Sequence, residues 1–370
     1  MLKFRNLKKK FFATVTAASL GFSLTFGAPV TTEAASAAGS LIGIGIQAAQ
    51  VSAQINASIK HYNTTEEGRQ ELYQAFQQKY GVSENYQYNA ALDRIMANLT
   101  RGVAAIDPTI KDKPYLYFVS AQNSVNAACS MGHVMMVNAG TFEKITNEDE
   151  IAAIVGHEMG HGQKDHVAKG QKKYLQKAVT TAVAGTALGG GIITSLVADV
   201  ALVHSVAHGD RKFESEADLL SFDYMVHTNY NPGACAAVMQ KFVELEETSK
   251  KRSSMEKFFN PSDHPDSDKR RDAHVKKLFE YSGKHVTAKD GVVIVNNKNF
   301  VNVAPSATMS GAERSYFVLG NLAVAYHKGL NKHAATVQNG TVMLGNQEIV
   351  TPIEGDEDAY TLADRLNAIK

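Results

Sequence analysis

Two histidines four residues apart, with a glutamate between them, are the residues of this chain best suited to chemistry. They occur in the segment His157-Glu158-Met159-Gly160-His161. On a helix of about 3.6 residues per turn, His157 and His161 lie on one face, so both imidazoles can reach the same ion. Glu158 then lies about a quarter-turn away, where a carboxylate can act on a water molecule held by a metal. The spacing predicts a catalytic zinc site on one helix.

The residues that follow this segment exclude one way of completing the site. A metzincin motif requires a glycine at position 164 and a histidine at position 167, but the chain has Lys164 and Val167 there. His166 is nine residues after His157 and points to the opposite side of an ideal helix. We therefore expect His166 to cap or pack rather than to bind the metal.

A later acidic segment offers the missing carboxylate ligand. The sequence Glu214-Ser215-Glu216-Ala217-Asp218 has acidic residues at helical spacing. Glu214 is the best placed candidate for the third ligand, which would complete a His-His-Glu site. Asp218 lies one turn further on the same face and can accept a hydrogen bond from a ligand imidazole.

These segments form part of an ordered series of motifs that resembles the HtpX and BepA type of gluzincin metallopeptidase. That family also contains the prenyl-protein proteases and the Oma-type mitochondrial proteases. The resemblance covers about residues 60–282, and the matching segments in chain order are Asn126-Ala127, His133 to Gly140, Asn147 to Gly156, Arg211, Glu214 with Ala217-Asp218, His264-Pro265 and Arg270. Residues 128–132 depart from the family, which usually has an apolar residue and Pro-Gly-Gly there. The resemblance therefore does not extend to the shape of the substrate groove.

The resemblance implies a zinc endopeptidase that acts on protein or peptide substrates. It implies that His157, His161 and Glu214 bind one Zn²⁺ per chain, with Glu158 as the general base and Asp218 beside the ligands. The alternative is a zinc-containing scaffold or chaperone that holds peptides without cleaving them. Metal storage fits poorly, because a single site binds little metal.

Residues outside the ligand set are expected to contact the substrate or support the site. The resemblance places Asn126, Ala127 and His133 at an edge strand that pairs with extended peptide, and an ordinary core sheet is the alternative. His264 lies in a polar loop and could stabilise an oxyanion, or it could cap the next helix. Arg270, six residues later, could support this loop or bind substrate.

An uncharged stretch from Ala178 to Ala198 is long enough to consider as a membrane span. Three consecutive glycines, residues 189–191, interrupt it. We therefore favour a helical hairpin packed near the site, with contact at a membrane surface as the alternative. His204 and His208 follow at i and i+4, but no carboxylate base lies between them, so helix-surface histidines are favoured over a second metal pair.

The N-terminus has the pattern of a signal peptide at residues 1–37. Basic residues precede an apolar segment from Phe11 to Val30, and Ala35-Ser36-Ala37 offers a small-residue cleavage site. An uncleaved anchor is the alternative, whereas a lipoprotein anchor is disfavoured because no cysteine lies near the cleavage region. The pattern predicts export to the periplasm or cell envelope of a bacterium.

The charge and cysteine content of the chain bear on its partners and on the state of its thiols. The first 37 residues hold five Lys or Arg and one acidic residue, which leaves 33 basic and 36 acidic side chains in the rest of the chain. No basic stripe with interleaved aromatic residues is present, so we expect no nucleic-acid partner. The two cysteines, Cys129 and Cys235, could form a disulfide or lie buried as separate thiols.

Apolar periodicity and turn signals divide the exported part of the chain in two. We expect residues 38–283 to form a mainly helical zincin-type metalloprotease domain with a small sheet beside the zinc helix. Its expected helices lie at 40–60, 65–80 and 88–100, and its strands at 115–120, near 126 and at 134–138. A length of 370 residues and a hydrophobic content of 44% allow a second domain.

An internal repeat occupies the C-terminal part, residues 284–370. Residues 290–301 match residues 339–350, and each copy has the pattern of a hairpin followed by a helix, at 312–326 and 356–369. The repeat is weakly similar to tandem hairpin-helix modules at the N-termini of some amine-oxidase-like envelope proteins. It predicts a tandem ββα domain that docks to a substrate, the cell wall or another partner, with a packing extension as the alternative. The expected fold class of the whole chain is therefore α+β.

Overall fold

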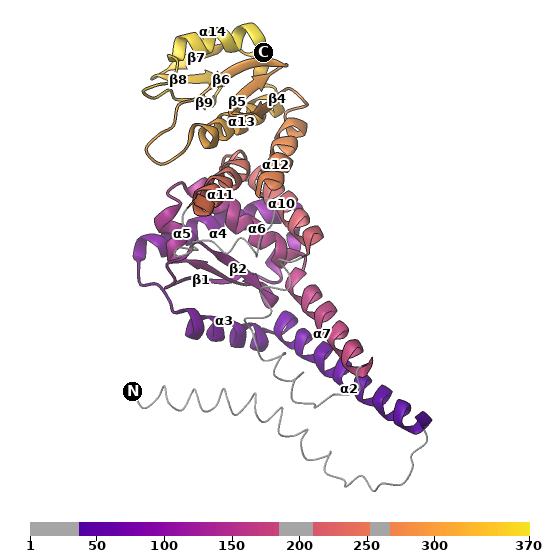
Figure 1. Ribbon diagram of the computed structural model, residues 1–370. Coiled ribbons are helices and arrows are strands. Elements are labelled where there is room, and N and C mark those ends of the chain that lie inside the picture. Colours follow the sequence, from indigo (N-terminus) through magenta and orange to yellow (C-terminus); the bar gives the residue numbers. More distant parts are fainter. Residues whose placement is uncertain (1–36, 185–209, 252–266) are drawn as a thin grey trace.

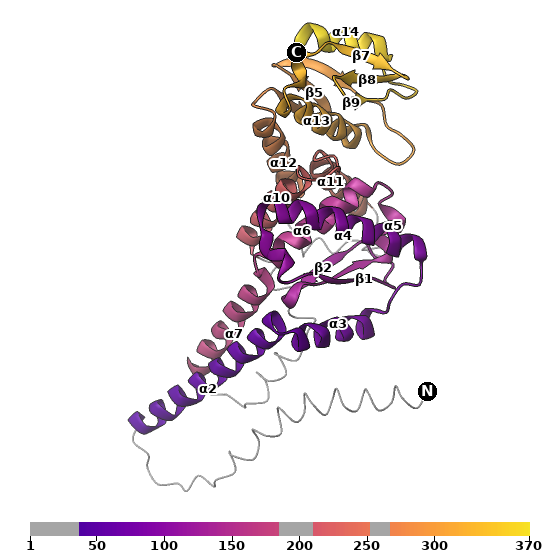
Figure 2. The ribbon, with the colours of Figure 1, turned by 180° about the vertical axis from the view of Figure 1, so that it is seen from behind.

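The computed structural model describes residues 37–184, 210–251 and 267–370. As predicted, these residues form an α+β structure in which helices predominate and the strands make three small sheets (Figures 1 and 2). The expected signal peptide, the candidates His204, His208 and His264, and most of the apolar stretch at 178–198 lie outside the described residues.

Four long helices pack against the first sheet or extend away from it (Figures 1 and 2). The helices are α2 (Ala37–Thr64), α3 (Glu66–Tyr80), α4 (Tyr86–Ile106) and α7 (His166–Ala184). Helices α2 and α7 run side by side and extend away from the body of the molecule (Figures 1 and 2). Thr65 and Asn85 accept backbone N–H bonds at the starts of α3 and α4, which explains why these helices begin there. Among the described helices, none is both long and apolar enough to cross a membrane.

The first sheet has three strands in the order β1-β3-β2, so β2 occupies an edge. Strand β1 runs parallel to β3, and β2 runs antiparallel to it. The strands are β1 (Leu116–Ser120), β2 (Ala127–Ser130) and β3 (Val134–Asn138), and the turn η2 (Met131–His133) joins the last two. Short helices η1 (Pro108–Lys111) and α5 (Ala139–Lys144) precede and follow this sheet.

Two helices that pack on each other carry the predicted metal ligands, and one of them lies beside β2. Helix α6 (Glu148–Gln163) begins at Asn147, whose side chain accepts two backbone N–H bonds, and three acidic residues in its first turn complement the helix dipole. Helix α10 (Arg211–Met225) begins after Asp210, which accepts a backbone N–H bond in the same way. Helix α6 contacts both β2 and α10, so it lies between the sheet and the second helix.

The C-terminal part repeats a three-strand sheet followed by a helix. The first unit is β4 (Val286–Lys289), β5 (Val292–Val295), β6 (Lys298–Asn302) and α13 (Gly311–His327). The second is β7 (Ala335–Gln338), β8 (Thr341–Leu344), β9 (Gln347–Val350) and α14 (Ala359–Ile369), with the turn η3 (Leu330–Lys332) before it. Each unit therefore has one strand more than the predicted hairpin. The units also interlock, because α13 contacts β9 and α14 contacts β6.

Helices α11 (Ala234–Lys251) and α12 (Ser267–Tyr281) connect the two parts of the chain. Both contact α13, and α12 also contacts α10 and β4. One hydrophobic cluster runs from Leu92 through Val155 and Leu278 to Leu366. The division at residue 283 stays a prediction, since the described residues share this continuous core.

Candidate metal centre

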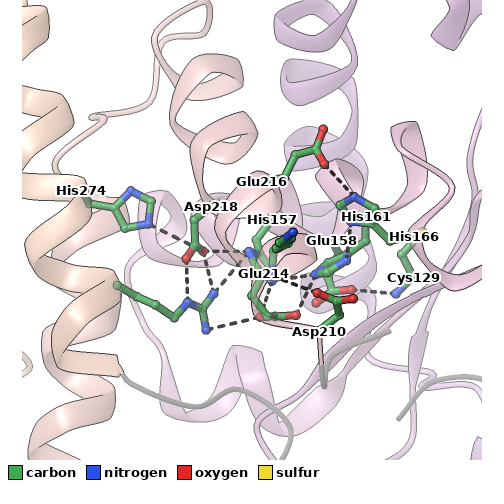
Figure 3. Close-up of polar contacts among 12 residues, drawn as sticks. Cys129, His157, Glu158, His161, His166, Asp210, Glu214, Glu216, Asp218 and His274 are labelled. Atoms are coloured by element: carbon green, nitrogen blue, oxygen red, sulfur yellow. Dashed lines mark hydrogen bonds and ion pairs between the residues drawn. The ribbon is translucent and has the colours of Figure 1, made fainter. Parts of the chain in front are cut away.

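Helix α6 brings His157 and His161 together on its buried face. Their Nε2 atoms lie 3.1 Å apart, and the two side chains are 5% and 0% exposed (Figure 3). This is the arrangement that the i, i+4 spacing predicts.

Helix α10 places Glu214 opposite the two imidazoles. Its Oε1 lies 3.2 Å from His161 Nε2, and its Oε2 lies 3.5 Å from His157 Nε2. The close crossing of the helices makes this possible, because a Cβ added to Gly160 would lie only 3.0 Å from the Cα of Ala217. A glycine on α6 and an alanine on α10 thus allow the ligands to converge.

The donor set fits zinc. Two imidazole nitrogens and a carboxylate oxygen are common zinc ligands, and tetrahedral bonds of about 2.0–2.2 Å place neighbouring ligand atoms about 3.3 Å apart. The separations among His157, His161 and Glu214 range from 3.1 to 3.5 Å. Among the described residues, these three form the one set of three or more His, Cys, Asp or Glu side chains whose ligand atoms all lie within 4.8 Å of one another. We call these three residues the metal centre.

Asp218 and Arg270 form a buried ion pair behind His157. His157 Nδ1 lies 2.9 Å from Asp218 Oδ1, and Arg270 donates to both carboxylate oxygens, at 2.8 and 2.7 Å. Burial alone would raise the pKa of Asp218, but the Arg270 guanidinium outweighs it and holds that pKa well below the usual range. Burial and Arg270 lower the pKa of His157, yet the Asp218 and Glu214 carboxylates raise it to about 9 overall.

Helix α12 supplies a second side chain to the same carboxylate. His274 is 3% exposed and its Nε2 lies 3.8 Å from Asp218 Oδ1. It is one turn after Arg270, so both residues face Asp218 from α12. Sequence reasoning did not identify His274, although its i, i+4 relation to Arg270 is a visible signal.

Glu158 lies between the metal centre and the edge of the first sheet. It is 2% exposed, and its Oε2 accepts a hydrogen bond of 2.8 Å from the Cys129 backbone amide of β2 (Figure 3). Burial raises the pKa of Glu158 to about 7, against the lowering effect of His157 and the Cys129 N–H group. A carboxyl group with this pKa can accept and release a proton near neutral pH.

The three residues predicted for a substrate strand occupy different positions. Asn126 precedes β2, and Ala127 is the first residue of this edge strand. His133 does not lie on the strand edge as expected. It belongs to the turn η2 with a φ of 57°, and its ring contacts the Lys113 carbonyl at 2.7 Å and the Gly162 carbonyl at 3.2 Å. His133 therefore ties the sheet to the end of α6.

His166 lies against the metal centre, contrary to the expectation from an ideal helix. Helix α6 ends at Gln163, Asp165 adopts a φ of 51°, and a new helix begins at His166. The turn returns the His166 ring to the centre, where its Nδ1 lies 3.0 Å from His161 Nδ1. An aspartate tolerates this backbone conformation better than most residues, but Asp165 alone would not have identified the turn.

Both cysteines are buried free thiols. Cys129 is in β2 and Cys235 is in α11, where its sulfur lies 3.9 Å from Ser221 Oγ. The structure thus corresponds to the separate-thiol alternative and not to a disulfide.

Comparison with known proteins identifies similar chains. The model of Peptidase family M48 matches residues 87–277. The metalloprotease LoiP of Escherichia coli K12 is 32% identical over 178 residues, which are 46% of this chain and 66% of LoiP. The metalloprotease YcaL of the same organism is 30% identical over 34% of this chain and 50% of YcaL. The mitochondrial metalloendopeptidase OMA1 of Arabidopsis thaliana is 29% identical over 33% of this chain and 24% of OMA1. The chain thus spans at most about two thirds of the length of these relatives.

Proposed function

This chain belongs to peptidase family M48, and on that basis we propose that it is a zinc endopeptidase that cleaves extended segments of protein substrates. The metal centre beside Glu158 is the observation that supports this function best. Membership of the family indicates that the general reaction is metal-dependent hydrolysis of peptide bonds. The identity of the metal as zinc, the substrate class and the cellular location are our proposals.

In this proposal His157, His161 and Glu214 hold one zinc ion. Bound zinc would polarise a water molecule and the scissile carbonyl. The protein orients the ligands by hydrogen bonding, because Asp218 accepts from His157 Nδ1 and leaves Nε2 directed at Glu214. Arg270 keeps Asp218 ionised and fixed in this role.

In this proposal Glu158 is the general base and then the general acid of the reaction. Its carboxylate accepts a proton from the attacking water at one Oε atom and then donates it to the nitrogen of the leaving amine. The Cys129 amide holds Oε2, so the orientation of the carboxylate is set by β2 before substrate arrives. A pKa of about 7 suits a group that must act as base and then as acid.

The outer edge of β2 would align the substrate. Asn126 O accepts from the Asn138 amide, whereas the Cys129 amide points away from β3 to Glu158. Because backbone groups alternate along a strand, those of Ala127 also point outward. An extended peptide could pair with this edge through main-chain hydrogen bonds, which require little side-chain selectivity.

We place this activity in the cell envelope of a bacterium, with misfolded or unassembled proteins as substrates. The support is the pattern of the first 37 residues and the main-chain mode of substrate pairing. Fractionation of cells that express the full chain tests the location. Recovery in the cytoplasm at full length would contradict export.

Cleavage of casein by the zinc-loaded chain and its Glu158→Gln variant tests the reaction. We expect fragments from the natural chain and a loss of about 10²–10⁴-fold in the variant, with equal zinc content in both. Glu143→Gln, a matched change at an exposed residue of α5, should leave the rate unchanged. Equal cleavage by the natural chain and Glu158→Gln would exclude the proposed mechanism. Tight casein binding without cleavage by either would instead indicate a scaffold.

A further inference from the structure

His161 is held between two groups that contact opposite sides of its ring. Its Nε2 faces Glu214 Oε1 at 3.2 Å, and its Nδ1 faces His166 Nδ1 at 3.0 Å. His166 continues the series, because its Nε2 lies 3.2 Å from Glu216 Oε2 (Figure 3). A chain of hydrogen bonds thus runs from Glu216 through His166 to the metal ligand.

The direction of each hydrogen bond follows from the ligand role of His161. If His161 Nε2 binds an ion, its proton must reside on Nδ1, since a neutral imidazole carries one N–H group. That N–H group donates to His166 Nδ1, which must then be the acceptor nitrogen. The proton of His166 therefore resides on Nε2, from which it donates to the Glu216 carboxylate. This series of hydrogen bonds has one consistent arrangement of protons, and it directs the lone pair of His161 Nε2 at the metal centre.

The surroundings of His166 fix its ring in the orientation that this role needs. The side chain is 0% exposed and stacks on Phe213 of α10, with ring centroids 4.2 Å apart and planes at 10°. Phe213 and Glu216 flank the ligand Glu214 on the same helix. One short segment of α10 therefore supplies a ligand, a stacking partner and a hydrogen-bond acceptor.

We infer that His166 is a positioning residue that fixes the tautomer and orientation of His161 for metal binding. The two histidine ligands then have different supports. His157 is held by a buried carboxylate with its own arginine, whereas His161 is held by an imidazole whose acceptor, Glu216, is 48% exposed. A residue that only packed would need neither nitrogen, yet both nitrogens of His166 have hydrogen-bond partners, and one of these partners is a metal ligand.

This inference rests on the proposed zinc site, so its test measures zinc affinity directly. Competition with a chromogenic chelator gives the zinc Kd of the natural chain and of His166→Phe, which keeps the stack on Phe213 but removes both nitrogens. We expect His166→Phe to weaken zinc binding about 10–100-fold. His166→Gln, which restores an acceptor, should recover part of this loss, and Glu216→Gln should lose less than His166→Phe. His227→Phe, the same change at an exposed histidine of the chain, should stay within about twofold.

The melting temperature of the metal-free protein separates positioning from packing. If His166 positions His161, metal-free His166→Phe melts close to the natural chain and the stabilisation gained on adding zinc shrinks. An unchanged zinc Kd in His166→Phe, whatever its melting temperature, would overturn the inference. If His166→Phe does not fold, an unchanged Kd in both His166→Gln and Glu216→Gln overturns it equally. Absence of zinc binding by the natural chain would refute the proposed function itself, and the Kd of that chain distinguishes the two failures.

Discussion

Gly160 of α6 and Ala217 of α10 meet so closely that a Cβ added to Gly160 would lie 3.0 Å from both the Cα and the carbonyl oxygen of Ala217. Gly160 directly precedes His161, and Ala217 directly precedes Asp218. The distance between the two helices therefore sets the distance between the metal ligands and the residues that orient them.

Gly160→Ala should weaken metal binding. Overpacking costs about 1–3 kcal/mol, which exceeds the gain of roughly 0.5–1 kcal/mol from replacing a helical glycine by alanine. The neighbouring atoms are backbone, so the helices must move apart. Gly156→Ala is the graded control, because its new Cβ would meet a side-chain atom, the Ser221 hydroxyl, at 3.0 Å rather than backbone. Zinc titration measures the metal affinity of each variant, and urea unfolding measures its stability. Unchanged zinc affinity in Gly160→Ala would show that the helix separation does not set the ligand positions.

Arg270→Met should destabilise the protein strongly. It leaves Asp218 buried beside His157 without its counterion, and breaking such a pair costs about 3–5 kcal/mol. The double variant Asp218→Asn with Arg270→Met removes both charges and should recover much of the loss. Urea unfolding of the metal-free proteins measures the coupling. Additive losses in the two single variants would show that the pair does not act as a unit.

Because Glu150 is buried, we expect the free energy of unfolding to fall as the pH rises. It is 1% exposed at the junction of the two parts, where Lys241 lies 3.6 Å away and also binds Glu313 at 2.9 Å. Burial, with smaller contributions from the nearby Glu313 and Asp149, raises the pKa of Glu150 from its reference value of 4.5 to about 7, despite Lys241. Burial also raises the pKa of Asp149 to about 6, so both groups act in the same direction.

The direction of this pH dependence follows from proton linkage. The folded protein holds the Glu150 proton more tightly than the unfolded chain, so this stabilisation is complete below about pH 4.5 and is lost as the pH rises through about 7. The loss is on the order of 3 kcal/mol. Glu150→Gln should be more stable than the natural chain at pH 8. Its unfolding free energy should also differ less between pH 5 and pH 8 than that of the natural chain. Parallel pH profiles for the two proteins would refute this role.

The two cysteines should titrate as two free thiols and should be protected in the folded protein. Burial raises the pKa of Cys129 well above its ordinary value and that of Cys235 to about 12. A thiol reagent such as DTNB should react slowly with the native protein and with two thiols per chain in denaturant without reductant. Fewer than two in denaturant would indicate a disulfide after all.

The histidine pair of the metal centre was predictable because its geometry is local, whereas Glu214 joins it from a second helix and was identified by the motif it belongs to. The spacing of His157 and His161 needs only helix periodicity, and Glu214 with Asp218 repeats the same spacing on a second helix. His166 was misplaced because the same periodicity was extended past Gln163, where the chain turns at Asp165. Periodicity describes a helix but does not say where the helix ends.

Contacts between distant segments explain the other differences. The buried position of Glu150 depends on Lys241 and Glu313, which come from α11 and α13. The strands β4 and β7 were missed because they precede the matched segments of the repeat. Like β5 and β8, which belong to those segments, they are only four residues long. Strands this short are recognised by the neighbours they pair with rather than by their own pattern.

Helix α12, which carries Arg270, has a consequence for how the protein is made. Chains emerge from the ribosome N-terminus first, so the three metal ligands appear before the arginine that neutralises Asp218. Until α12 has been synthesised and has packed against α10, His157 faces a carboxylate that lacks its counterion. The peptidase site therefore matures late, when the link to the C-terminal units is already present, and a nascent chain that stops short of this helix carries the complete metal motif without a finished active site.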